Sequence, residues 1–258
     1  MELKNLFSFR EQSDEALPFM DHLGDLRVMI IRIAVTLVLA MVGAFFFRGI
    51  LATVVQRPLI AVDPIRASSL QSLGVADSMT ISLELSFYAG LIISFPIILI
   101  FIAQFLFPAL KPTERKILLP VAAFGMALFV TGILFAYVVV LPGTLDFFFK
   151  DAKSMHWTPT WTVREYYSFT TQFMIAFGVA FEMPMVVLAL VKIGILNTEK
   201  LRKARSVAII TIFTVAAFIT PSPDFVTYLL MGGPMVVLYE FCIVLAKWVE
   251  PKTTIAVE

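Results

Sequence analysis

The stretch that decides the fold runs from Val28 to Phe47 and reads VMIIRIAVTLVLAMVGAFFF. A bilayer core of about 30 Å is crossed by about 20 apolar residues in a helix, and this run has that length with Arg32 as its single charge. It is too long for the core of a signal peptide, and no small-residue cleavage pattern follows it. We therefore expect a retained membrane helix, in which Arg32 lies one turn inside and extends its charge to the membrane surface.

The composition extends this interpretation to the whole chain. The 258 residues are 59% hydrophobic, include 25 Phe, and have a mean hydropathy of +0.90. A water-soluble domain cannot bury that much apolar surface. The formal net charge of +1 gives no indication of a nucleic-acid partner, and none is expected. The single Cys242 allows neither an internal disulfide nor a thiolate metal cluster.

Further apolar runs predict an all-α polytopic membrane protein, with six transmembrane helices in one integral membrane domain over residues 1–258. We expect these helices near residues 28–47, 79–107, 117–141, 166–192, 206–220 and 225–248. The fifth reaches only about 22 Å at 1.5 Å per residue. The sixth contains Gly232-Gly233-Pro234. Pro96 and Pro184 predict bends in the second and fourth helices.

Lys and Arg are distributed unevenly between the two sets of connecting segments. Six crossings place both termini on one side of the membrane, and the segments on that side carry thirteen Lys and Arg against six in the opposite loops. By the positive-inside rule, both termini are predicted to be cytoplasmic. The two long opposite loops, residues 48–78 and 142–165, are long enough to form a cap.

Glu182, in the stretch FGVAFEMP at residues 177–184, is the most informative charge in these helices. It falls near the middle of the fourth predicted helix, where a charge costs at least about 2.5 kcal/mol. Three structural roles are open: a protonated carboxyl, a hydrogen bond to a neighbouring helix, or a place in a local water defect. The alternative that we favour is a docking point for a partner helix or substrate.

Two rival functional classes depend on the same region. A proton-coupled secondary transporter that uses Glu182 is the main alternative, but the chain lacks further intramembrane partners and a symmetric pair of broken helices. The two histidines, His22 and His156, fall on opposite faces of the predicted membrane, and no HExxH or GxSxG motif occurs. An enzyme is therefore not expected, and neither is a cofactor or a bound metal.

Five motifs together carry a resemblance to a known family. They are HLGDLR, FPALKPTERK, FGVAFEMP, ITPSPD and GGPMVVLYE, in this order along the chain. The chain resembles the TatC family of twin-arginine protein translocase subunits over most of its length. The resemblance implies a cupped bundle with short fifth and sixth helices in the bacterial cytoplasmic membrane. It also implies a receptor for the twin-arginine signal peptides of folded proteins, which self-associates, assembles with the single-span subunits TatA and TatB, and uses the proton-motive force.

The resemblance assigns a signal-peptide-binding surface to five residues. They are Asp25 and Arg27 in the N-terminal motif, Phe105 near the end of the second helix, and Glu114 and Arg115 in the loop that follows. Carboxylates suit this role because they accept two parallel hydrogen bonds from a guanidinium group, a fork that lysine cannot supply.

Two more residues receive roles elsewhere in the chain. Glu182 corresponds to an acid on the concave side of the bundle, where it meets a polar side chain of TatA, TatB or the inserted signal peptide. Asp224 corresponds to a turn acid, for which capping of the next helix is the expected structural role. The chain departs from the family at three positions: Asp25 replaces the usual Glu, Glu84 stands where Lys is frequent, and Tyr228 stands where the family has glutamine.

Overall fold

The computed structural model describes residues 19–67, 70–106, 118–192, 194–219 and 225–249. These ranges are helical apart from short connections and one isolated β-bridge between Gln71 and Thr162. Five candidate spans are long and apolar enough to cross a membrane, and a shorter apolar helix lies at Arg205–Ala217. The predicted all-α polytopic membrane fold is therefore confirmed.

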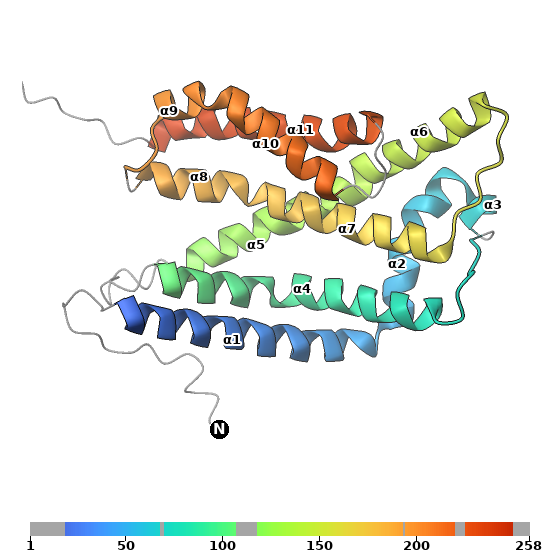
Figure 1. Ribbon diagram of the computed structural model, residues 1–258, viewed down its shortest axis with the longest axis horizontal. Helices are drawn as coiled ribbons and strands as arrows, with labels where there is room; N and C mark the ends of the chain where they lie inside the picture. Colours follow the sequence, from blue (N-terminus) through green and yellow to red (C-terminus); the bar gives the residue numbers. More distant parts are fainter. Residues whose placement is uncertain (1–18, 68–69, 107–117, 193, 220–224, 250–258) are drawn as a thin grey trace, which may run out of the picture.

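Figure 1 shows the helices in chain order, coloured from blue to red. They are α1 (Phe19–Phe45), α2 (Arg48–Val62), α3 (Pro64–Ala67), α4 (Asp77–Leu106), α5 (Leu118–Phe135), a π-helical turn (Ala136–Val140), α6 (Leu141–Ser154), α7 (Val163–Phe181), α8 (Met183–Lys192), α9 (Thr198–Lys203), α10 (Arg205–Ile219) and α11 (Phe225–Val249). Two of the five spans combine successive helices: α5 runs through the π-helical turn into α6, and α7 continues into α8.

The third predicted helix continues well beyond its expected end at residue 141. The π-helical turn carries it into α6, which ends at Ser154. The added turns bury Leu141, Leu145 and Phe149, and the Phe149 ring stacks on Trp161 with 4.5 Å between ring centroids. The apolar run alone could not predict this extension, because α6 is polar on its other face and is held by tertiary packing.

The last two helices differ in length, whereas the resemblance implied that both are short. α10 has 15 residues, as expected, but α11 has 25 and continues through Pro234. A proline is tolerated in a membrane helix where neighbouring helices support the freed backbone groups. Gly232 brings α10 close at this point, since a Cβ there would lie 2.5 Å from a ring carbon of Phe213. The expectation of a short sixth helix is therefore wrong.

The long connection after α1 is a helical cap rather than an open loop. In Figure 1, α2 runs across the direction of the spanning helices at the end of the molecule where α4 begins. Pro58 has no backbone N–H, so the carbonyl four residues earlier, at Val54, loses its usual helical donor. Tyrosine hydroxyls from the spans bond to α2 carbonyls: Tyr137 to Val54 at 2.6 Å, Tyr166 to Val55 at 2.8 Å and Tyr167 to Ala52 at 3.2 Å.

The first helix lies against α4 and is otherwise largely open. Of the residues in its apolar window, 6% are buried, against 33–39% in the other four spans. The two helices are antiparallel neighbours (Figure 1). They meet most closely at Gly90, where a Cβ would lie 2.7 Å from the backbone nitrogen of Met41. A residue without a side chain is required at this crossing because small residues let membrane helices approach closely.

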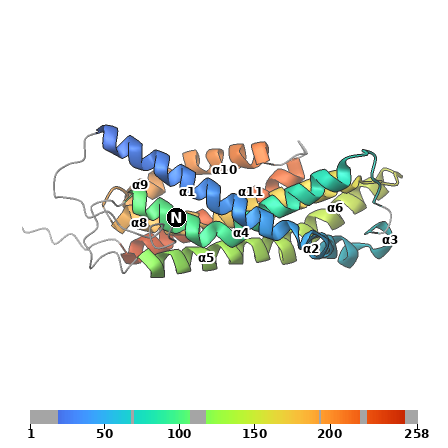
Figure 2. The same cartoon turned by 90° about the horizontal axis from the view of Figure 1, so that it is seen from below.

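Figure 2 shows the bundle from below. α10 and the N-terminal half of α1 stand on one side of the molecule, and α5 lies on the opposite side. α5 packs tightly against α7, since a Cβ on Gly132 would lie 2.6 Å from the carbonyl oxygen of Phe177. The ring of Phe129 on α5 also stacks on Phe95 of α4, with 3.7 Å between centroids.

Candidate functional site

Asp25 and Phe105 lie at the same level of the molecule, on neighbouring helices. Met41 and Gly90 are in register between the antiparallel α1 and α4. Each helix rises 1.5 Å per residue, so moving sixteen residues from this crossing brings α1 to Asp25 and α4 to Leu106. Asp25 and Phe105 are both half-buried. The fold therefore brings a carboxylate and an aromatic ring to one membrane end of the α1–α4 pair.

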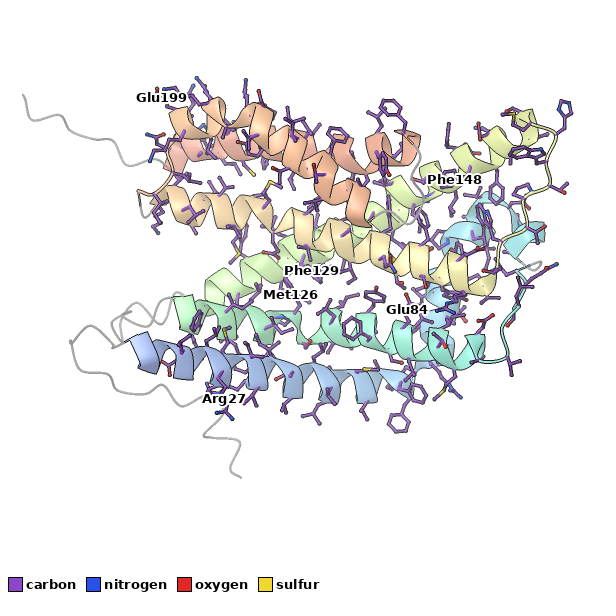
Figure 3. The ribbon with its side chains drawn as sticks, viewed as in Figure 1. Arg27, Glu84, Met126, Phe129, Phe148 and Glu199 are labelled. Atoms are coloured by element: carbon purple, nitrogen blue, oxygen red, sulfur yellow. The ribbon has the colours of Figure 1, made fainter. Side chains whose placement is uncertain are left out.

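The other predicted members of this site stand differently. Arg27 is exposed, and Figure 3 shows its side chain on the side of α1 that faces away from α4. Glu114 and Arg115 lie outside the described residues, in the stretch 107–117 that joins α4 to α5 in the sequence. Asp224 also lies outside the described residues. Of the five residues predicted for the signal-peptide surface, the structure thus brings Asp25 and Phe105 to one level and turns Arg27 outward.

Glu182 is buried inside the protein, with 8% of its surface exposed. Its carboxyl is turned toward α5, where Oε2 would lie 3.2 Å from a Cβ built on Gly125. The same position would approach the Leu99 Cδ1 at 2.7 Å and the Met185 Sδ at 2.9 Å. In Figure 2, α5 lies on the opposite side of the molecule from α10 and the start of α1.

One oxygen of this carboxyl is left without a hydrogen bond. Glu182 Oε1 is buried and has no partner among the described residues. Buried polar groups in membrane proteins are normally paired, because an unpaired group in a low-dielectric interior costs free energy. Of the three structural roles left open by the sequence, a hydrogen bond to a neighbouring helix is absent from the described part of the chain. The carboxyl is thus able to accept or donate a bond to an incoming group.

The helix is interrupted at the same residue. α7 ends at Phe181 and α8 begins at Met183, so Glu182 is the joint between them. Its N–H donates to Val179 O at 3.1 Å, the three-residue spacing of a helix end, and Val186 N then donates to Glu182 O at 3.1 Å. Pro184 explains the break, because it cannot donate to the carbonyl of Ala180. The break lies two residues before this proline.

A second intramembrane carboxyl, Glu84, is held between two spans. Glu84 on α4 accepts a hydrogen bond from Ser168 Oγ on α7 at 2.7 Å, and Thr171 Oγ1 lies 3.5 Å from its other oxygen. Figure 3 shows Glu84 in the space between these helices. Tyr88 and Gln172 lie in the same cluster. The signal that could have found it is a Ser and a Thr three residues apart on one face of α7.

Basic side chains gather at the end of the molecule where α1 begins. α8 ends there and α9 and the start of α10 follow, as Figure 1 shows. Arg205 pairs with Glu240 of α11 at 2.6 Å, and Lys203 pairs with Glu199 at 2.7 Å. Both pairs are substantially exposed, so they contribute little to stability.

In the described part of the chain, no three His, Cys, Asp or Glu residues are grouped to hold a metal ion.

Comparison with known proteins gives one consistent result. Residues 21–234 match the family model of the Sec-independent protein translocase protein (TatC). A TatC protein of Carboxydothermus hydrogenoformans is 34% identical over 239 residues, which cover 93% of this chain and 96% of that protein. A TatC protein of Akkermansia muciniphila is 43% identical over 176 residues, or 68% of this chain, and the match spans about half (51%) of that relative's length.

The fold comparison agrees with the sequence comparison. A crystal structure described as the twin-arginine translocase receptor TatC matches with a TM-score of 0.80 and 33% identity. The match covers 88% of this chain and 99% of that one. The predicted family resemblance is thereby confirmed. On its sequence, its helix arrangement and these matches, this multi-pass membrane protein belongs to the TatC family of Sec-independent, twin-arginine protein translocase components.

Proposed function

We propose that this chain is the signal-peptide receptor and core subunit of a twin-arginine translocase in a bacterial cytoplasmic membrane. It binds the twin-arginine signal peptides of folded proteins at the membrane end that carries Asp25. It assembles with TatA and TatB, and it supports export that is driven by the proton-motive force. Protein transport is the work of the family, so the solute-transporter alternative is not retained.

The observation that carries this proposal is that Asp25 on α1 and Phe105 on α4 lie at the same height along this pair of helices. A carboxylate accepts charge-assisted hydrogen bonds from a guanidinium, and an aromatic face attracts the same planar cation. Glu114, in the sequence that follows α4, supplies the second carboxylate in this proposal. Two consecutive arginines then have one acid each, whereas lysines offer only point charges.

The charge distribution supports a cytoplasmic placement of this end. The basic residues of α9 and the start of α10 lie at the same end as the start of α1 (Figure 1). A bacterial membrane retains Lys-rich and Arg-rich segments on its cytoplasmic face. Signal peptides are presented from the cytoplasm, so a receptor site for them belongs at this end.

Glu182 is proposed as the docking point for a polar side chain of a single-span partner. Its unpaired oxygen supports this role, because a donor from a second helix removes the cost of an unsatisfied buried group. Replacement by Gln keeps the shape but changes the hydrogen-bonding capacity. We expect Glu182→Gln to reduce photo-crosslinking between residue 186 and a TatA or TatB helix. Unchanged crosslinking and export would remove Glu182 from the docking site.

The receptor role is tested by binding of a fluorescent signal peptide to the purified protein in nanodiscs. An Arg-Arg peptide and its Lys-Lys variant are compared on the wild type, on Glu114→Gln and on Glu199→Gln. Glu199 is a matched control, because it is an exposed acid at the same end of the molecule that is paired within its own helix. We expect selective Arg-Arg binding that Glu114→Gln weakens about tenfold, or about 1.4 kcal/mol, and Glu199→Gln leaves intact. Equal and weak binding of both peptides by the wild type would overturn the receptor role of the isolated chain.

A further inference from the structure

A glycine on α5 stands opposite the buried carboxyl of Glu182. The position that a Cβ of Gly125 would occupy is 3.2 Å from Glu182 Oε2, 2.7 Å from Leu99 Cδ1 and 2.9 Å from Met185 Sδ. Any side chain at residue 125 would therefore compete with the carboxyl for this space. The absence of a Cβ leaves a slot between α4, α5 and α8 into which Glu182 fits.

The slot does not satisfy the carboxyl. The two atoms nearest to this position besides the carboxyl oxygen are an aliphatic carbon of Leu99 and the thioether sulfur of Met185, and Glu182 Oε1 has no partner among the described residues. A carboxyl that served only to join helices would be expected to meet a donor in the slot. The arrangement instead leaves one oxygen of the carboxyl buried without a hydrogen bond.

The backbone around Glu182 lets this side chain change direction. Glu182 separates α7 from α8 and has backbone angles of φ −74° and ψ −16°. The two flanking helices are supported by different neighbours, since α7 packs mainly on α5 and α8 packs mainly on α11. A rotation at this joint would redirect the side chain while each helix keeps its main neighbour, as in a hinge.

We propose that Gly125 is a positioning residue, whose missing side chain leaves the slot that holds the Glu182 carboxyl against α5 until a partner's hydrogen-bond donor draws it out. The second half of this inference rests on the proposed docking function of Glu182. The first half concerns this chain alone, and it can be tested without a partner.

The variant that tests the slot is Gly125→Ala. The two closest atoms to the new methyl group are the ends of the flexible Leu99 and Met185 side chains, which can move aside, so the fold is expected to tolerate it. The carboxyl oxygen is then displaced from the slot. Gly43→Ala is the control for adding a methyl group to a membrane helix, because nothing lies within 4 Å of that position. Gly132→Ala is the control for loosening α5 from α7, because its methyl group would meet the backbone of Phe177 instead.

The measurement is the extent of reaction with dicyclohexylcarbodiimide, an apolar reagent that couples to protonated carboxyl groups, in purified protein in nanodiscs. The reaction is run at a pH below the usual pKa of carboxyl groups, so that labelling reports the accessibility of each acid and not its charge. Peptide mass spectrometry gives the labelling of Glu182 relative to that of Glu84 in the same molecule. In the wild type we expect Glu182 to be labelled less than the half-buried Glu84. In Gly125→Ala we expect at least a fivefold rise at Glu182, with less than a twofold change in both control variants.

Each outcome decides the inference. No rise in Gly125→Ala overturns it, and so does an equal rise in Gly132→Ala, since that would mean that any loosening of α5 exposes the carboxyl. If Gly125→Ala does not fold, the wild-type ratio remains the test, and stronger labelling of Glu182 than of Glu84 overturns the slot. A further outcome is that labelling changes as expected while crosslinking to the partner is unchanged in Glu182→Gln. That result would support the slot and refute only the docking function.

Discussion

The carboxylate of Glu84 on α4 accepts a hydrogen bond from the hydroxyl of Ser168 on α7, with 2.7 Å between the two oxygens. Glu84 lies seven residues into α4 and therefore in the half of the membrane remote from Asp25. Helices in lipid gain little from apolar contact, so polar links of this kind contribute to which helices pair. The bond fixes α4 to α7 at the level where the tyrosines of α7 support the cap.

Removing this link is expected to weaken the fold measurably. Ser168→Ala should lower the free energy of unfolding by about 0.6–1.7 kcal/mol, the range for hydrogen bonds between membrane helices. A double-mutant cycle with Glu84→Gln, followed by thermal unfolding in detergent, isolates the coupling between the two side chains. Thr131→Ala is the control, since that exposed hydroxyl donates to Ala127 O in its own helix. Strictly additive effects of Ser168→Ala and Glu84→Gln would mean that the bond contributes nothing.

The cap is expected to depend on the tyrosine that compensates for Pro58. Tyr137→Phe leaves Val54 O without a donor, which costs about 1 kcal/mol or more if water cannot replace the hydroxyl. Tyr166→Phe should cost more, because Tyr166 is 3% exposed and its bond to Val55 O is buried. Hydrogen exchange of the α2 amides measures the effect directly. Protection of α2 that is unchanged in both variants would show that the cap is held by apolar packing instead.

Hydropathy predicted the spanning segments well, because each crossing requires an apolar run of a fixed length. It missed α2, since Pro58 and the polar residues around it are typical of a loop, and the helix depends on tyrosines more than eighty residues away. The extension of α6 to Ser154 is supported by the stacking of Phe149 on Trp161, which lies outside the helix. Long-range support of this kind leaves no periodic signal in the local sequence.

The same limit applies to the candidate sites. Asp25, Phe105 and Glu182 could be selected from the sequence, because a charge or a motif marks each of them. The direction of the Glu182 side chain could not, since it depends on Gly125 in another helix. The hydrogen bond of Glu84 could not be predicted either, because its partner Ser168 on α7 lies more than eighty residues away.

The crossing of α1 and α4 is expected to control the receptor end from a distance. Gly90→Ala adds a methyl group 2.7 Å from the backbone nitrogen of Met41. This contact is with the backbone of α1, which cannot move aside as the end of a flexible side chain can. α1 must shift, so Asp25 and Phe105 no longer lie at the same height along the two helices. We expect weaker binding of an Arg-Arg signal peptide and slower disulfide formation between cysteines introduced at Leu37 and Ser94, which lie about one turn from this crossing on α1 and α4. Gly43→Ala, which has open space around it, is the control and should change neither measurement.

Unchanged peptide affinity in Gly90→Ala, with a demonstrable shift of α1, would separate the binding site from the α1–α4 register. That result would leave Glu114 as the main acid of the site. It would also place the recognition of the signal peptide on the 107–117 connection, rather than on the pair of helices.

Asp25 and Arg27 are two residues apart in sequence but are expected to differ sharply in their effect on peptide binding. Asp25 is half-buried at the level of Phe105, whereas Arg27 is exposed and faces away from α4 (Figure 3). Asp25→Asn removes one charge-assisted interaction, so the affinity for an Arg-Arg peptide should fall about tenfold, which is about 1.4 kcal/mol. The wild-type affinity should also decrease with added salt, and Asp25→Asn should remove part of that dependence.

Arg27→Gln should change the affinity less than twofold, because the Arg27 guanidinium is not directed toward Asp25. Equal losses of affinity in Asp25→Asn and Arg27→Gln would mean that both residues act through the fold of α1. A direct contact with the peptide would be lost only in Asp25→Asn.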